Sequence, residues 1–204
     1  MLTLVLERLR LARWDEAADR HVLSAFAMVI LSIAGACLTG LLAQLRIYLL
    51  FTPVPVTGQV LAVLICGGFL GGGYGLLSQV IYVGLGAAGL PWFADGTGGV
   101  AALIGPSGGY LLGFVMAAYF LGAATKRSAE ARALEGQMML MLIAVGIIYF
   151  FGVLHQMLVL GWSPLQAILL GAAPFIAVDV VKAVMAAMVT SAALPGRSSS
   201  AQAD

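Results

Sequence analysis

Charged side chains are scarce in this chain, at 9% of its 204 residues, and they leave a net charge of +1 at pH 7. Proteins that bind nucleic acid present clustered basic residues to the phosphates, so we expect no nucleic-acid partner. The sequence also lacks a Gly-Lys dipeptide, and it therefore has no Walker A motif with which to hydrolyse ATP. We expect a protein that is not an enzyme and that draws energy for any active process from elsewhere.

Cysteine is rare as well, because the chain contains only Cys37 and Cys66. Both lie within long apolar stretches, where a free cysteine usually behaves as a small buried hydrophobic side chain. We therefore expect neither a disulfide nor a metal site at these positions, and we expect no cofactor.

Hydrophobic residues are abundant, at 62% of the chain, and the mean hydropathy is +1.05. A soluble domain of this length could not bury so much apolar surface, whereas a membrane span needs roughly 20 apolar residues. We predict an all-α integral membrane protein in contact with membrane lipid, with six transmembrane helices in one domain over residues 22–194. The stretches that approximately qualify are residues 22–43, 57–72, 74–90, 107–125, 138–160 and 175–194. The second and third are short, which favours a tight helical hairpin.

The basic residues are distributed unequally between the two sides of such a bundle. Eight of the ten lysines and arginines fall on one side, only Arg46 falls on the other, and Lys182 lies within a span. The positive-inside rule then places both termini in the cytoplasm. Apolar residues at helical spacing predict an amphipathic helix over residues 1–21, on the inner membrane surface. Residues 195–204 are small and polar, which predicts a disordered cytoplasmic tail.

Asp179 and Lys182 lie inside the last apolar stretch. Ionisable groups at membrane depth are costly and usually face a partner or a cavity. Three residues apart on a helix, these two share one face and can pair with each other or flank a polar ligand. The alternative is an ion pair that only joins neighbouring helices.

Two connecting segments on the side of Arg46 are unusual. Residues 46–59 are nearly all apolar, but Pro53 and Pro55 favour extended backbone there. Residues 89–110 are rich in glycine and carry three aromatic side chains. The second segment fits the mouth of a small-molecule site, and it also fits a re-entrant turn anchored by interfacial aromatics.

The first apolar stretch carries small residues on one face, at Ser32, Ala36 and Gly40. Small residues four apart let two helices approach closely in a membrane. This face either packs inside the bundle or docks onto a partner, which could be another membrane subunit or a second copy of the chain.

Several segments, in the same order and spacing, resemble BioY proteins, the biotin-binding S components of energy-coupling factor (ECF) transporters. These segments are T-P-V-P-V-T-G-Q ending at Gln59, I-Y-V-G-L-G-A-A-G-L-P-W-F-A ending at Ala94, G-T-G-G ending at Gly99, G-P-S-G-G-Y-L-L-G-F ending at Phe114, and D-V-V-K ending at Lys182. The resemblance implies a six-helix ECF S-component bundle in a prokaryotic plasma membrane. It further implies high-affinity binding of biotin from outside and uptake energised by two ABC-type ATPases through a membrane scaffold subunit.

The resemblance also implies a set of binding residues. Asp179 and Lys182 would make polar contacts to biotin, because a carboxylate accepts from ureido N–H groups and an ammonium suits a carbonyl or carboxylate oxygen. Gln59 would bond an amide-like part of the ligand. The remaining residues would either pack on biotin or let the loop close over it; they are Tyr82, Phe93, Gly98, Gly99, Gly108, Gly109 and Tyr110.

Other interpretations remain open at this point. Gly105-Pro-Ser107-Gly resembles the motif of rhomboid serine proteases, with His155 in another span as a base. The same fold could carry another vitamin, because pocket side chains choose the ligand and the fold does not. A solute channel is a further alternative, with Gln79 and Gln156 lining a pore.

Overall fold

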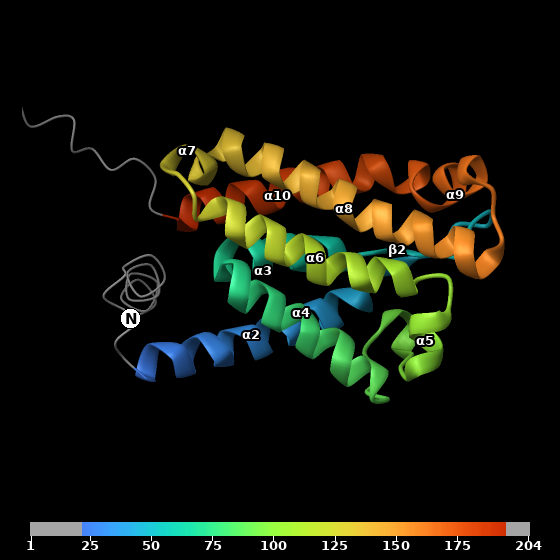
Figure 1. The fold of residues 1–204 in the computed structure, drawn as a ribbon, viewed down its shortest axis with the longest axis horizontal. Helices are drawn as coiled ribbons and strands as arrows, with labels where there is room; N and C mark the ends of the chain where they lie inside the picture. Colours follow the sequence, from blue (N-terminus) through green and yellow to red (C-terminus); the bar gives the residue numbers. More distant parts are fainter. Residues whose placement is uncertain (1–21, 195–204) are drawn as a thin grey trace, which may run out of the picture.

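The computed structural model describes residues 22–194 as a bundle of helices that run alternately in opposite directions (Figure 1). The long helices are α2 (Val22–Ala43), α3 (Gln59–Leu70), α4 (Gly72–Ala87), α6 (Gly108–Thr125), α8 (Leu134–Leu160) and α10 (Ile176–Ala193). Each lies within a few residues of one of the predicted stretches. The predicted helix over residues 1–21 and the tail over residues 195–204 lie outside the described part of the chain.

Four apolar segments of the described chain are long enough to cross a membrane, namely Ala25–Ala43, Gly108–Thr125, Leu134–Leu160 and Pro164–Ala193. The other two long helices, α3 and α4, have 12 and 16 residues and follow each other directly. Gly71 joins them at a φ of 81°, a conformation that side-chain-bearing residues rarely adopt. Gly122 of α6 packs against this turn so closely that a Cβ would collide with the Gly71 backbone. The predicted helical hairpin is therefore present.

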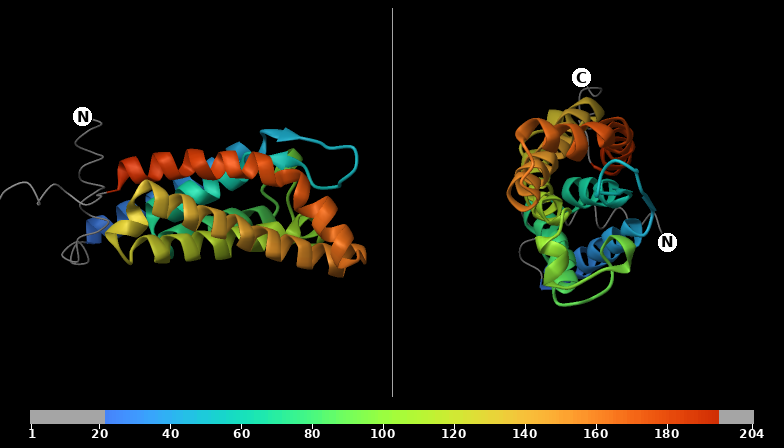
Figure 2. Two further views of the ribbon diagram at one scale, coloured as in Figure 1. Left: turned by 90° about the horizontal axis from the view of Figure 1, so that it is seen from above. Right: turned by 90° about the vertical axis from the view of Figure 1, so that its right-hand side faces the viewer.

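The short elements gather mostly at one end of the bundle, opposite the start of α2 and the end of α10 (Figure 2). Those at this end are β1 (Arg46–Ile47), β2 (Val56–Thr57), η2 (Ala94–Gly96), α5 (Val100–Ile104), α9 (Pro164–Gly171) and η3 (Ala173–Phe175). The two strands pair antiparallel, with Arg46 opposite Thr57. At the other end, α7 (Ala129–Arg132) links α6 to α8.

Local sequence explains where α9 and α10 begin. Ser163 and Gln166 form a capping box at the start of α9, and Pro164 occupies its first turn, where no backbone N–H is needed. Pro174 lies in η3, and α10 begins at Ile176, one residue after the start expected from the sequence.

The small-residue face of α2 packs inside the bundle. Ala36 is completely buried, and the Ser32 hydroxyl donates to the Tyr74 carbonyl at 3.1 Å. Gly40 lies against the Trp92 side chain, where a Cβ would be only 3.1 Å from the ring. This face is therefore not available to a partner, and the docking interpretation of it is wrong.

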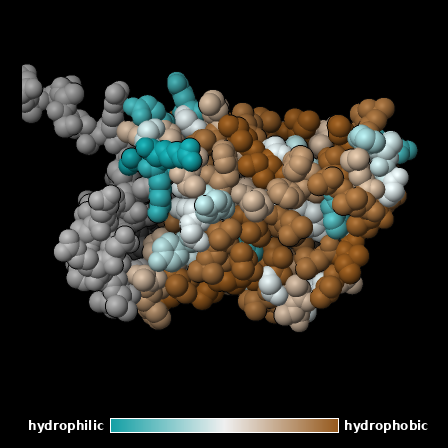
Figure 3. All heavy atoms as spheres, viewed as in Figure 1, coloured by the Kyte–Doolittle hydropathy of each residue, from teal (hydrophilic) through white to brown (hydrophobic). Residues whose placement is uncertain are grey.

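The expectation for the two cysteines is half right. Cys66 is buried in α3, whereas Cys37 is exposed on the outer face of α2. The apolar stretch did not reveal this difference, because the outer surface of the bundle is itself largely hydrophobic (Figure 3). Such a surface is appropriate for contact with lipid.

Candidate functional site

A cavity of about 280 Å³ lies inside the end of the bundle that carries the short elements. It is lined by residues from the β1–β2 connection, the η2–α5 segment, the first turns of α3, α6 and α10, and the middle of α8. Most of the lining is apolar or aromatic, as in small-molecule sites generally. Residues of this kind in the lining include Val54, Phe93, Tyr110, Leu111, Phe114, Ile148 and Phe175.

The predicted pair of charges forms one polar wall of this cavity. Lys182 Nζ lies 2.6 Å from Asp179 Oδ1, and the two side chains are only 12% and 4% exposed. Lys182 Nζ also donates to the Thr57 carbonyl oxygen at 2.6 Å. An ammonium has three N–H donors, so one donor of Lys182 remains for a ligand.

Tyr149 completes this wall from α8. Its hydroxyl donates to Asp179 Oδ2 at 2.7 Å, so each oxygen of the carboxylate has one protein donor. A carboxylate oxygen accepts up to two hydrogen bonds, and Asp179 therefore keeps acceptor capacity toward the cavity. The contacts join α8, α10 and β2 around one buried negative charge.

A second polar group in the wall is centred on Gln59, the first residue of α3. Its amide nitrogen donates to the Tyr82 hydroxyl at 2.6 Å, and its oxygen accepts from the Thr57 hydroxyl at 2.8 Å. Tyr82 is completely buried behind Gln59 and lies outside the cavity lining. Its ring packs against Trp92 and Phe93, with centroids 5.2 and 5.3 Å apart.

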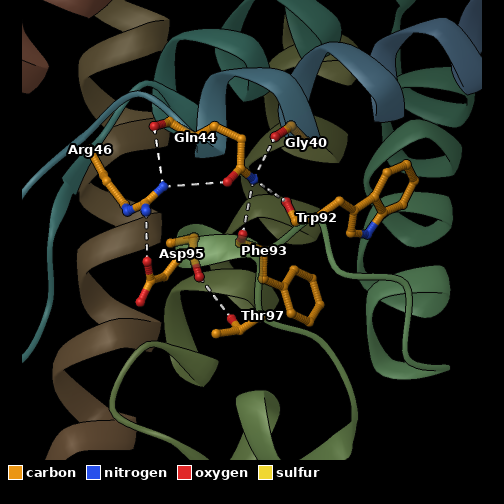
Figure 4. Close-up of polar contacts among 8 residues, drawn as sticks. Gly40, Gln44, Arg46, Trp92, Phe93, Asp95 and Thr97 are labelled. Atoms are coloured by element: carbon orange, nitrogen blue, oxygen red, sulfur yellow. Dashed lines mark hydrogen bonds and ion pairs between the residues drawn. The ribbon is translucent and has the colours of Figure 1, made fainter.

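The rim of the cavity is held by a network between the end of α2 and the η2 segment (Figure 4). The Gln44 side-chain amide donates to the carbonyl oxygens of Trp92 and Phe93, at 3.2 and 3.1 Å. Arg46 Nη2 pairs with Asp95 Oδ1 at 2.6 Å, and Asp95 itself belongs to the cavity lining.

Five of the residues that the resemblance to BioY proteins implies do line the cavity. They are Gln59, Phe93, Tyr110, Asp179 and Lys182. Tyr110 both lines the cavity and supports α9, because its hydroxyl donates to the Gly171 carbonyl at 2.6 Å. The sequence did not single out Tyr149 or the apolar residues of α6 and α8. The Thr57 contacts could have been anticipated from its place in the T-P-V-P-V-T-G-Q segment.

The four implicated glycines shape the surrounding backbone and are not part of the lining. Gly99 has a φ of 88°, and a Cβ on Gly98 would lie 2.6 Å from the Leu90 carbonyl oxygen. Gly108 and Gly109 let the start of α6 pack tightly against Leu103 and His155. Close neighbouring backbone at Gly98, Gly108 and Gly109, and the positive φ of Gly99, are each sufficient reason for glycine at these positions.

The protease alternative finds no support in this geometry. His155 Nε2 lies 3.0 Å from the Gly105 carbonyl oxygen. Within residues 22–194, no hydrogen bond joins His155 to Ser107, so the histidine is not placed to activate the serine. Gln79 and Gln156 are buried in the bundle and do not line the cavity, which argues against the channel alternative.

Comparisons with known proteins agree with this picture. The model of the BioY family matches residues 16–198. A protein named probable biotin transporter BioY, from Methanothermobacter thermautotrophicus, is 44% identical over 63% of this chain and 87% of its own length. The biotin transporter BioY of Thermotoga maritima is 40% identical over 67% of this chain and 79% of its own length. The crystal structure of an S component for biotin from an ECF-type ABC transporter superposes with a TM-score of 0.78. That structure has 24% sequence identity and covers 84% of this chain and 93% of its own, and the likeness shows the fold.

Proposed function

The chain belongs to the BioY family, and from that premise we propose that it is the biotin-binding membrane subunit of a biotin uptake system. The observation that carries this proposal is the buried Asp179–Lys182 pair in the wall of an otherwise apolar cavity. A buried charge pair is costly unless further partners satisfy it, and here it faces space that a polar ligand can occupy.

The chemistry of the cavity suits biotin. Biotin combines an apolar bicyclic body, a ureido group with N–H donors and a carbonyl acceptor, and an aliphatic chain ending in a carboxylate. The aromatic rings of Phe93, Tyr110 and Phe114 offer flat apolar surface to the body and chain. The free acceptor capacity of Asp179 and the third donor of Lys182 complement the polar groups.

We further propose that coupling to energy comes from partners. The sequence carries no Walker A motif, so a scaffold subunit and ABC-type ATPases would supply ATP hydrolysis. A second copy of the chain remains the alternative partner. Because the small-residue face of α2 is buried, any such partner would meet another surface of the bundle.

The proposed orientation places the cavity toward the outside. Lys126, Arg127 and Arg132 lie at the α7 end, where α2 starts and α10 ends, whereas Arg46 lies at the cavity end. Cytoplasmic segments carry the excess of basic residues, so the α7 end and both termini would face the cytoplasm.

Uptake of labelled biotin by bacterial cells that lack their own biotin transporter tests the proposal. We expect uptake when the chain is expressed with a scaffold subunit and ATPases, and loss of uptake for Asp179→Asn at equal expression. Competition by unlabelled biotin, but not by thiamine or riboflavin, would distinguish biotin from another vitamin. Inhibition by another vitamin alone would contradict the assignment.

A further inference from the structure

A second hollow lies on the outside of the bundle, away from the cavity. It is a groove of about 440 Å³ between α6 and α8. The lining residues that come from α6 recur every three or four positions and so share one helix face. Two further lining residues come from α8. The lining consists of Met116, Tyr119, Phe120, Ala123, Ala124, Arg127, Ile147 and Phe151. We call this surface the α6–α8 groove.

The α6 side of the α6–α8 groove, from Met116 to Arg127, is about as long as one membrane leaflet is thick. From Met116 to Arg127 a helix rises about 16 Å, at about 1.5 Å per residue. The hydrocarbon core of a bilayer is about 30 Å thick, so one leaflet contributes about half of that. This side of the groove would therefore run from near the middle of the membrane to its surface at the α7 end.

The two ends of the groove differ in character. Along most of its length the lining is aromatic or aliphatic, with the small side chains of Ala123 and Ala124 leaving room between larger neighbours. At the α7 end the groove finishes at Arg127, next to exposed Lys126. Figure 3 shows the corresponding change, from a hydrophobic surface over α6 and α8 to hydrophilic side chains at the α7 end.

Arg127 has no ion-pair partner among residues 22–194, and its side chain is exposed. Arginine forms strong two-point hydrogen bonds to phosphate, and basic pockets between helices at the membrane surface attract anionic head groups. The α6–α8 groove is apolar, covers about one leaflet along α6 and ends in such a cation. It is therefore complementary to a lipid with a negative head group.

We propose that the α6–α8 groove binds an anionic phospholipid, with an acyl chain along α6 and the phosphate at Arg127. The contacts divide between the two parts of the lipid. Tyr119, Phe120 and Phe151 contact the chain, and the guanidinium holds the head group. The site is separate from the cavity, because it opens on the outer surface and its charged residue lies at the opposite end of α6.

Native mass spectrometry of the purified, delipidated protein tests this site, with phosphatidylglycerol and phosphatidylcholine of identical acyl chains as the probes. We expect phosphatidylglycerol to bind about five-fold more tightly, the factor that one basic residue near the membrane surface provides. Arg127→Gln should abolish the preference. Arg132→Gln removes a cation at the same end but outside the groove, and it should leave the preference intact.

A second pair of variants tests the acyl part. Ala124→Leu fills the groove and should lower binding of both lipids at least three-fold. Gly146→Leu adds the same side chain to α8 in open space outside the groove and should change neither. Thermal unfolding checks that all variants are folded. Equal binding of the two lipids by the wild type, an unchanged preference in Arg127→Gln, or unchanged binding in Ala124→Leu would each overturn the proposal.

Discussion

The Tyr149 hydroxyl donates to Asp179 Oδ2 at 2.7 Å, while Lys182 Nζ holds the other oxygen of the same carboxylate at 2.6 Å. Asp179 is thus fixed from two helices before any ligand arrives. Preorganisation of this kind lowers the conformational-entropy cost of binding. It also makes Tyr149 part of the site, although its side chain comes from an apolar helix.

Tyr149→Phe should weaken biotin binding about five-fold, because one hydrogen bond worth about 1 kcal/mol no longer orients Asp179. Tyr119→Phe is the matched control, since Tyr119 is half exposed and does not line the cavity. Equilibrium binding of labelled biotin to both variants measures the effect. Equal affinity of Tyr149→Phe and the control would show that Tyr149 has no part in positioning the carboxylate.

Gln59→Leu should reduce both stability and biotin binding. The change leaves the buried Tyr82 hydroxyl without its 2.6 Å partner, at a cost of about 1–3 kcal/mol. Gln79→Leu is a comparable change at a buried glutamine outside the cavity. Thermal unfolding should shift in both variants, but only Gln59→Leu should lose biotin affinity. A loss of affinity in Gln79→Leu as well would assign the effect to general loosening of the bundle.

Arg46→Ala should speed the release of biotin while hardly changing the unfolding temperature. The Arg46–Asp95 pair is partly exposed, and such pairs contribute at most about 1 kcal/mol to stability. Because this ion pair joins two segments at the cavity rim, the same energy would slow the separation of those segments, and so the release of biotin, up to about five-fold. A chase of bound labelled biotin with unlabelled biotin measures the release rate. The double variant Arg46→Ala/Asp95→Ala should match the single one, and a further acceleration in the double variant would argue against the pair as the cause.

Ala36→Leu should destabilise the protein by about 1–3 kcal/mol, because the side chain has no space inside the bundle. Ala34→Leu lies two residues away on the exposed face of α2 and should have little effect. Thermal unfolding of the two variants separates the outcomes. If both unfold like the wild type, Ala36 is not an internal packing position.

The helices and the charge pair could be predicted from the sequence for clear physical reasons. Long apolar stretches can only cross a membrane as helices, and two ionisable residues three apart must share a helix face. The breaks between α3 and α4 and before α10 follow from Gly71 and Pro174, whose backbone preferences act locally.

What could not be predicted is how each helix is rotated about its axis. Lipid and protein interior are both apolar, so a transmembrane helix such as α8 carries little sequence contrast between its two faces. Tyr149 therefore gave no sign that it faces Asp179, and Cys37 and Ala36 gave no sign that one is exposed and the other buried. The conspicuous glycines suggested a ligand-facing loop, whereas the backbone geometry shows them at tight turns and close contacts.

Equilibrium binding of labelled biotin to the purified, detergent-solubilised protein tests the central claim most directly. The wild type should bind saturably, and Asp179→Asn should weaken binding by about 1–3 kcal/mol, roughly 5- to 150-fold. Glu135→Gln makes the same chemical change at the opposite end of the bundle and should bind like the wild type. Folded wild-type protein that does not bind biotin, or an Asp179→Asn variant that binds it as tightly, would contradict the account.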